Sequence, residues 1–462
     1  MQKWTLNLQN LSTGGYSSSY WKNNFSSYGN SNQSPAMVSI DMTDPNCIKQ
    51  GPGLVVVDTN TNPTGTIKGI MGTLADTGLT YGISATKVYS IASAEIVELS
   101  PDSAITGGED ITLYGDKLKW SHDTDIGSAD NPWANPNENW WTTVVSGGAL
   151  TSGKCHQLLI AGTTGLMTVL NGSVVASWDG TVDGGVVDSA FDTQDTDIEL
   201  ISQIWCQNRY FFAGNKPNVV GKNEGSVFVW DGNSASWDYQ IKIQGKIGAL
   251  WNKNGIPYIF YKKNMSQGVC TLGYIDGASI TDITNYLGSL PSWYQVTDFE
   301  DFIIFASGTT LMAWGGGDLN VNTRLFKFGT CGAGGLSNPF GVPITAALNS
   351  LQKFSGFTVT SSWYSMLFLV NGNARKSMLD KIKLNLDVLE TGARMDLTLK
   401  NNAGTSLATK TISYSANGAI TSYDWYPKVV TDNFQLQINY ANGSTSKTVA
   451  VRSVFIEGHY II

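Results

Sequence analysis

Two short sequence markers recur along the chain at a step of 45 to 52 residues. The first is an apolar strand ending in an aromatic or small residue, with copies at Leu159-Ile160-Ala161, Phe211-Phe212-Ala213, Ile259-Phe260-Tyr261 and Ile304-Phe305-Ala306. The second is an X-Asp-Gly turn, with copies at Trp178-Asp179-Gly180, Trp230-Asp231-Gly232 and Ile275-Asp276-Gly277. Successive copies lie 52, 48 and 45 residues apart for the first marker, and 52 and 45 for the second. Two markers that both recur at this interval predict a β-propeller, in which four-stranded blades are arranged around an axis.

Weaker copies extend the predicted propeller over residues 67–375. They indicate about six blades. Five or seven also fit, because a Trp- and Asn-rich segment at 115–150, interpreted as an insertion, interrupts the spacing. Such a ring normally closes by borrowing a strand from the other end of the chain. The strand-like segment 53–58, Gly-Leu-Val-Val-Val-Asp, is the predicted donor.

After residue 375 the pattern changes to longer strands in which apolar and polar residues alternate. A period of two over several strands predicts a half-buried antiparallel sheet, and Asn-Gly and similar turns separate the strands. We therefore expect an antiparallel β-sandwich over residues 376–462. Its predicted buried positions are Ile382, Leu384, Leu386, Val388, Met395, Leu397, Leu399, Phe434, Leu436, Ile438 and Tyr440.

Residues 1–66 are polar and rich in turn-forming residues, which predicts an extended N-terminal arm that also carries the ring-closing strand. Only 14% of the 462 residues are charged, while 50 are Gly, so the composition favours an all-β fold over disorder or long exposed helices. The net charge of −8 would repel a phosphate backbone. Sequence-specific binding of nucleic acid is therefore not expected.

The cysteines and histidines give no sign of a cofactor, a metal centre or a catalytic site. The five cysteines are far apart in the sequence, and no CxxC pair occurs, so we expect buried free thiols in a protein assembled in a reducing compartment. The chain has three histidines, His122, His156 and His459, and a structural role is expected for each, although His122 is predicted to lie in a loop. None of the common catalytic motifs occurs, so the chain is predicted not to be an enzyme. The sequence also lacks an apolar run long enough to span a membrane.

One acidic segment could hold a cation. Asp123, Asp125 and Asp130 alternate with a glycine, Gly127, in a pattern that could wrap calcium with oxygen atoms. The spacing departs from that of an EF-hand, so a solvated acidic turn is the other interpretation. A sialidase is disfavoured, because its Asp box is not repeated in the other blades.

A second cluster is aromatic. Trp133, Trp140 and Trp141 lie, with Trp120 nearby, in a segment dense in Asn and Pro. Exposed tryptophan rings anchor protein partners or stack on sugars. Contact with a partner, binding of a sugar and plain packing over a blade edge all remain open for this cluster, and Trp133, Trp140 and Trp141 are the candidate partner contacts.

Together these segments resemble a known group of virion proteins. The N-terminal arm leads to Asp44-Pro45 and to Gln50-Gly51-Pro52-Gly53-Leu54, the Trp-Asp-Gly turns follow, and alternating strands such as the one after Lys381 close the chain. This layout is similar to that of the propeller proteins associated with the tails of double-stranded DNA bacteriophages, including the nozzle or DNA-stabilisation proteins of short-tailed phages.

The resemblance implies a structural virion protein of the tail, assembled in the host cytoplasm. Such proteins form a ring, commonly of six subunits, that extends the DNA-ejection channel and docks other tail proteins on the adaptor, fibre or portal side. Double-stranded DNA would meet the protein only in transit, and no integral membrane association is expected. The alternative is a receptor- or glycan-binding tail propeller.

Overall fold

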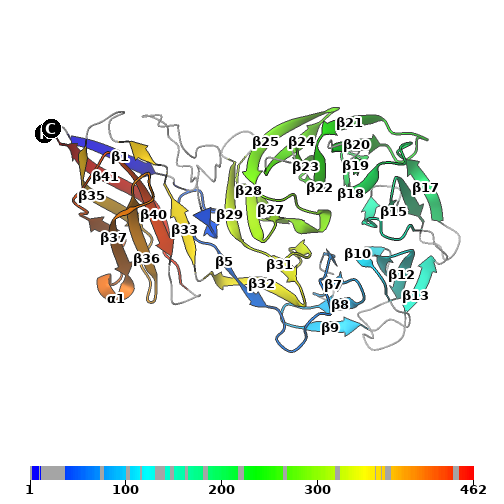
Figure 1. Ribbon diagram of the computed structural model, residues 1–462. Coiled ribbons are helices and arrows are strands. Elements are labelled where there is room, and N and C mark those ends of the chain that lie inside the picture. The colour runs from blue at the N-terminus through cyan, green and yellow to red at the C-terminus, as the bar shows by residue number, and fades with distance from the viewer. Residues whose placement is uncertain are drawn as a thin grey trace. The chain divides into compact units, whose positions relative to one another are not determined.

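The computed structural model describes residues 3–9, 11, 37–72, 78–99, 105–114, 117–130, 141–145, 150–161, 165–179, 186–216, 223–263, 268–317, 323–358, 360–365, 367–369, 376–440 and 447–461. Nearly all of the regular structure in these residues is β-strand (Figure 1). The helical elements among them are the four-residue helix α1 (Tyr414–Asn417) and the 3-10 turn η2 (Trp293–Gln295). The predicted all-β class is confirmed.

Small antiparallel sheets of four strands follow one another along the chain. The first sheet contains β6 (Gly69–Ile70), β7 (Thr80–Ile83), β8 (Val88–Ile91) and β9 (Ile96–Leu99), and the second contains β10 (Gly108–Tyr114), β11 (Lys117–His122), β12 (Asp125–Asp130) and β13 (Trp141–Val145). The third sheet contains β14 (Leu158–Ala161), β15 (Leu166–Asn171), β16 (Val174–Trp178) and β17 (Val186–Asp192). The fourth contains β18 (Glu199–Cys206), β19 (Arg209–Lys216), β20 (Glu224–Trp230) and β21 (Tyr239–Gln244).

Three further sheets complete the series. They are β22 (Lys246–Lys253), β23 (Ile256–Lys262), β24 (Val269–Asp276) and β25 (Ser279–Leu287); β26 (Val296–Phe299), β27 (Phe302–Ser307), β28 (Thr310–Gly315) and β29 (Arg324–Thr330); and β30 (Leu336–Ser337), β31 (Ile344–Ala347), β32 (Ser350–Phe357) and β5 (Pro52–Val56). In the last sheet the strand order β30-β31-β32-β5 places β5, which overlaps the predicted donor segment 53–58, at the edge.

The described residues thus hold seven four-stranded sheets of this kind, whereas the sequence spacing favoured six. The difference arises at 115–150, which was interpreted as an insertion. Strands β11, β12 and β13 of the sheet β10–β13 lie in that segment, and the strands of this sheet lack both repeat markers. The copies of the first marker also do not occupy the same strand in each sheet. Ile160 lies in the first strand of its sheet, whereas Phe212, Phe260 and Phe305 lie in the second strands of theirs.

The described chain separates into two compact units. Unit 1 comprises residues 1–55, 310–330 and 354–462, and unit 2 comprises residues 56–309 and 331–353. The first strand of each of the seven sheets falls in unit 2. The division of the chain at residues 66 and 375, expected from the sequence, stays a prediction.

Unit 1 contains two larger sheets. One is built from β1 (Lys3–Gln9), β41 (Val451–Tyr460), β35 (Ser377–Leu386), β38 (Ser422–Trp425) and β39 (Val429–Thr431). The other is built from β2 (Met37–Val38), β33 (Ser361–Tyr364), β40 (Asn433–Tyr440), β36 (Arg394–Lys400), β37 (Ser406–Ser413) and β34 (Phe368–Leu369). The short strands β3 (Ile40–Asp41) and β4 (Lys49–Gln50) pair with each other.

The predicted alternation holds in these sheets with one exception. Each predicted apolar position from Ile382 to Tyr440 is buried except Val388, which is 56% exposed. Strand β35 ends at Leu386, so the alternation stops before Val388, and the next residue, Leu389, is buried instead.

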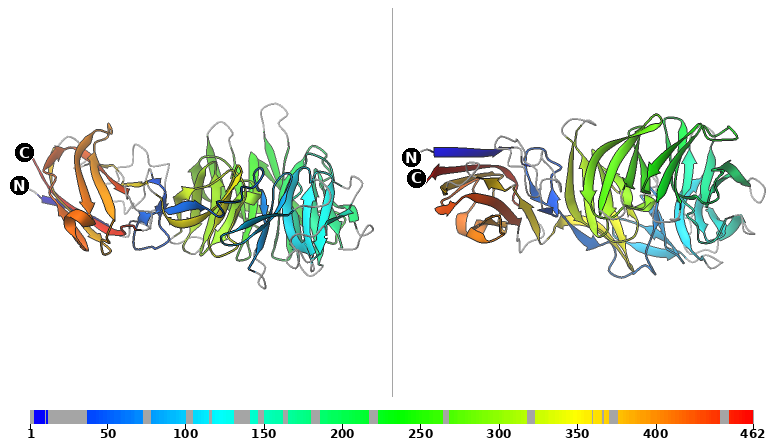
Figure 2. Two further views of the ribbon diagram at one scale, coloured as in Figure 1. Left: turned by 90° about the horizontal axis from the view of Figure 1, so that it is seen from below. Right: turned by 45° about the horizontal axis from the view of Figure 1, so that its top comes forward.

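The described parts of residues 1–66 do not form a free arm. Strand β1 pairs antiparallel with β41 over seven residues, from Lys3 opposite His459 to Gln9 opposite Ser453, so segments from both ends of the chain run side by side (Figure 2). The ring of Trp4 stacks on that of Phe434 in the other sheet of unit 1, with centroids 6.2 Å apart. This segment is therefore part of the packed structure, and the interpretation as an arm is wrong for β1.

Candidate functional site

The structure leaves the predicted tryptophan contact surface untested. Trp133 and Trp140 lie outside the described residues, and Trp141 begins β13 with only its backbone described. Trp120, which the sequence analysis grouped with them, lies in β11 and is only 2% exposed. It packs in a cluster of buried residues from the first two sheets and is not a surface residue.

The acidic segment forms a tight hairpin. Strands β11 and β12 pair from Lys117 opposite Asp130 to His122 opposite Asp125, which leaves two residues in the turn. One of these is Asp123, whose backbone is left-handed (φ 34°) and whose carboxylate accepts a hydrogen bond from the Ser152 hydroxyl. Within the described part of the chain no three His, Cys, Asp or Glu side chains converge as a metal site would require.

Two of the histidines sit beside this hairpin. His122 ends strand β11, so it does not lie in the predicted loop, and it is half-buried. His156 is 1% exposed, and its backbone N–H donates to a carboxylate oxygen of Glu109 at 2.8 Å. Burial lowers the pKa of both imidazoles, which favours their neutral forms. The third, His459, contacts the carboxylate of Asp380 on the neighbouring strand.

A central pocket of about 450 Å³ lies within unit 2. Every one of the seven sheets contributes residues of its first strand to the wall, and these strands surround a common centre in Figure 1. The contributing residues are Ile70 of β6, Asp110 of β10, Leu158, Leu159 and Ile160 of β14, Gln203, Ile204 and Trp205 of β18, Leu250, Trp251 and Asn252 of β22, Val296 and Thr297 of β26, and Leu336 and Ser337 of β30. Lys68, Gln157, Trp293 and Tyr294 complete the lining.

Hydrogen bonds between first strands hold this wall in place. Gln157 and Gln203 form a reciprocal pair, in which each side-chain amide donates to the backbone carbonyl of the other, at 3.2 and 2.6 Å. Farther around the circle, the Asn252 amide donates to the Trp205 carbonyl at 2.7 Å. The backbone N–H of Gly335 donates to a carbonyl just before β6 and thus links the last sheet to the first. Polar side chains of the pocket therefore have fixed orientations.

Asp110 forms one of these links and has an unusual ionisation. It is 7% exposed, and its two carboxylate oxygens accept the backbone N–H groups of Ile111 and Leu158 at 2.8 and 2.7 Å. Burial raises the pKa of the Asp110 carboxyl to about 7, because removal from water disfavours the charged form more strongly than the two N–H donors favour it. The adjacent Glu109 raises it further.

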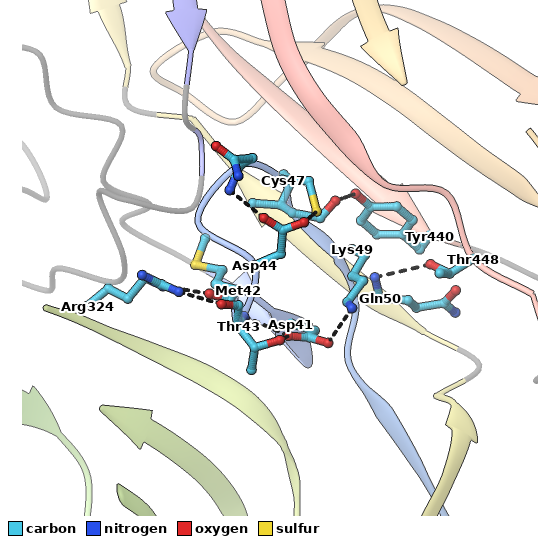
Figure 3. A network of polar contacts seen from close by, with 12 residues as sticks. Asp41, Met42, Thr43, Asp44, Cys47, Lys49, Gln50, Arg324, Tyr440 and Thr448 are labelled. Atoms are coloured by element: carbon cyan, nitrogen blue, oxygen red, sulfur yellow. Dashed lines mark hydrogen bonds and ion pairs between the residues drawn. The ribbon is translucent and has the colours of Figure 1, made fainter. Parts of the chain in front are cut away.

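A second polar network lies in unit 1, where residues 37–55 pass between β29 and the C-terminal strands (Figure 3). We call these residues the strap. Arg324 of β29, 3% exposed, donates to the backbone carbonyls of Met42 and Thr43 at 2.6 Å each. Within the strap, Lys49 and Asp41 form an ion pair at 3.2 Å.

The other side of the strap is bound to the end of β40, the start of β41 and the segment between them. The Tyr440 hydroxyl donates to the carbonyl of Ile48 at 3.1 Å, and the N–H of Gln50 donates to the hydroxyl of Thr448 at 3.3 Å. Backbone hydrogen bonds also join Ile48 and Val451 in both directions. The strap is thus held by fixed backbone contacts on two sides (Figure 3).

The cysteines behave as the sequence analysis expected. All five are free, and four are buried, while Cys155 is half-buried. Burial raises the pKa of Cys47, Cys155 and Cys331 to about 12 and that of Cys206 to about 11, so these thiols are unreactive near neutral pH. In Cys47, the neighbouring Asp44 carboxylate adds to the effect of burial.

Comparison with known proteins identifies no family for this chain. No protein-family model matches the chain, and no curated protein sequence matches it. Similar solved structures include an exo-β-1,3-galactanase from Phanerochaete chrysosporium, with 11% identity, a TM-score of 0.34, and coverage of 88% of this chain and 100% of the other. The extracellular domain of the one-component system BT4673 from B. thetaiotaomicron has 9% identity, a TM-score of 0.46, and coverage of 90% and 61%.

Neither neighbour supports an argument about the fold of this chain, because their TM-scores are only 0.34 and 0.46. At such low identity and TM-score they carry no argument about activity, and the galactanase does not decide whether this chain is an enzyme. Among the described residues, no helix is long and apolar enough to cross a membrane.

The sequence analysis missed the central pocket. Its lining comes from seven first strands spread over more than 260 residues, from Lys68 to Ser337, and no local motif connects them. A weak signal is an amide side chain that recurs at or next to the first strands of three successive sheets: Gln157 directly before β14, Gln203 in β18 and Asn252 in β22. These amides carry no repeat marker, so only the folded ring brings them together.

Proposed function

We propose that this protein is a structural component of a bacteriophage tail, a nozzle-like ring subunit that extends the DNA-ejection channel and docks neighbouring tail proteins. The proposal rests on the resemblance in sequence layout described above, and the all-β, propeller-like fold is compatible with it. The role is not enzymatic. Double-stranded DNA passes through the assembled ring, and an acidic chain suits that passage, because it does not grip phosphates.

The observation that best supports a mechanical role is the way the strap is held. Arg324 donates two short hydrogen bonds to strap carbonyls, and Tyr440 donates a third from the end of β40. These donors and acceptors are almost wholly buried and satisfied by one another. A part that must keep its shape while it transmits force benefits from such a fixed connection, and its polar groups are used for structure rather than chemistry.

The assay for this proposal is the mass of the full-length protein in solution over a range of concentrations, followed by negative-stain imaging. We expect a ring of about six copies. Truncation of the first 40 residues is unsuitable as a test of assembly, because it would remove β1 and β2 from the sheets of unit 1. A protein that stays monomeric at every concentration and yields no rings in images would count against the nozzle role.

A further inference from the structure

We propose that the central pocket of unit 2 is a binding site for a neutral carbohydrate of one or two pyranose rings. This inference does not depend on the tail role, and it concerns a different place from the Trp133, Trp140 and Trp141 segment. It rests on the size of the pocket, the side chains that line it and their charge.

The pocket has the dimensions of a small-molecule site. Its volume of about 450 Å³ lies within the range of roughly 300–1,000 Å³ typical of ligand pockets. Its wall is built from the first strands of seven sheets, which the hydrogen bonds described above tie to one another. A pocket on rigid strands presents its groups without the cost of ordering a loop.

Aromatic rings line one part of this wall. Trp205 and Trp251 come from the neighbouring strands β18 and β22, and Trp293 and Tyr294 come from η2, which directly precedes β26. All four are half-buried, so each keeps some surface accessible. The rings of Trp293 and Tyr294 stand perpendicular, with centroids 5.3 Å apart. Half-buried Trp and Tyr rings offer an apolar face beside a polar edge, which matches a pyranose with its C–H face and equatorial hydroxyls.

The polar groups of the lining are uncharged or already paired. Gln203 is 1% exposed, and its amide makes hydrogen bonds within the wall. The polar groups that keep exposed surface are the amides of Gln157 and Asn252, each of which has a second N–H besides the one described above, and the hydroxyl of Ser337. These groups can exchange hydrogen bonds with sugar hydroxyls. Fixed amides next to aromatic rings thus provide both kinds of contact that a sugar needs.

The charges of the lining disfavour ionic ligands. The cation Lys68 is paired with Glu109 at 3.3 Å, and the carboxyl of Asp110 is buried with both oxygens engaged by backbone N–H groups. No cluster of cations is present among the described lining residues to receive a phosphate or a carboxylate. Among the described residues, no three His, Cys, Asp or Glu side chains converge as the ligands of a metal ion would. Neutral ligands are therefore the class that the pocket selects.

The experiment is titration of the full-length protein with neutral sugars, with binding measured by calorimetry and by tryptophan fluorescence. The panel contains glucose, galactose, mannose, lactose, maltose and cellobiose, with glucuronic acid and glucose 6-phosphate as charged comparisons. We expect saturable binding of at least one neutral sugar, and binding weaker by about tenfold or more for its charged counterpart. Binding of none of the neutral sugars, or equal binding of the charged ones, would overturn the proposal.

Variants locate the site. Trp293→Ala removes a ring of the wall and should weaken binding by about tenfold. Trp237→Ala is the matched control, because Trp237 is also half-buried but packs against Phe228 away from the pocket. Ile160→Trp gives a second probe that is less prone to misfolding, since Ile160 lines the pocket and is 36% exposed, and the larger ring should block entry. Undiminished sugar binding by Ile160→Trp and Trp293→Ala would place the sugar elsewhere and refute the assignment.

Discussion

Asp110 should make the stability of this protein depend on pH in a direction opposite to that of most carboxylates. Its pKa is about 7 in the folded protein, against an ordinary value of 3.8. Between these two pH values the folded protein holds a proton that the unfolded chain has released. Raising the pH through this window therefore removes stability, and the stabilising contribution is fully present below about pH 4.

The magnitude follows from the size of the pKa shift. A shift of about three units corresponds to about 4 kcal/mol at 1.36 kcal/mol per unit, spread over the interval from about pH 4 to pH 7. The variant Asp110→Asn cannot ionise. It should lose this slope, although it also loses one acceptor for the N–H of Ile111 or Leu158 and is less stable at pH 5.

The assay is urea unfolding followed by tryptophan fluorescence at intervals from pH 5 to pH 8, in the wild-type protein and in Asp110→Asn. The difference between the two unfolding free energies should narrow by a few kcal/mol as the pH rises. Asp197→Asn, at an exposed aspartate, is the control and should follow the wild type. Parallel curves for Asp110→Asn and wild type would refute the argument that burial keeps Asp110 protonated.

Three further predictions concern packing. Gly127→Ala would place a Cβ 1.9 Å from Cε2 of the buried Trp120 and should destabilise the protein by about 3 kcal/mol in thermal unfolding. The control is Gly72→Ala, where the added Cβ meets nothing within 4 Å, and its effect on stability should be close to zero. Equal effects of the two substitutions would contradict this account. Arg324→Met leaves buried strap carbonyls without donors and should cost about 3 kcal/mol or more in urea unfolding, whereas an unchanged midpoint would show that the network is dispensable. Trp4→Ala should cost about 2 kcal/mol, because the half-buried ring stacks on Phe434, and a neutral result would show that this ring contact does not stabilise the protein.

Local chemistry alone determined the strands and several of their turns. The Trp230-Asp231-Gly232 turn is an example: the Asp231 carboxylate accepts the backbone N–H groups of Asn233 and Ser234 at 2.8 Å each, which lowers its pKa to about 2. Such contacts span two or three residues, so the residue types specify them wherever they occur. The alternating strands after residue 375 follow in the same way from a period of two. The all-β fold class and the alternation of buried and exposed residues in the strands could therefore be predicted from the sequence.

Only the tertiary structure determined which distant segments of the chain pack against one another. Strand β1 pairs with β41, and Arg324 forms a hydrogen bond to Met42, which lies 282 positions away in the sequence. No local sequence pattern could predict either contact. For Trp120 the sequence left both a surface contact and packing open, and the hairpin places its ring against Gly127, where the absence of a side chain leaves room for it. The pocket arises because seven first strands meet at one centre. Packing between distant segments depends on the whole fold, because each strand's own pattern specifies its buried face but not the partner that covers it.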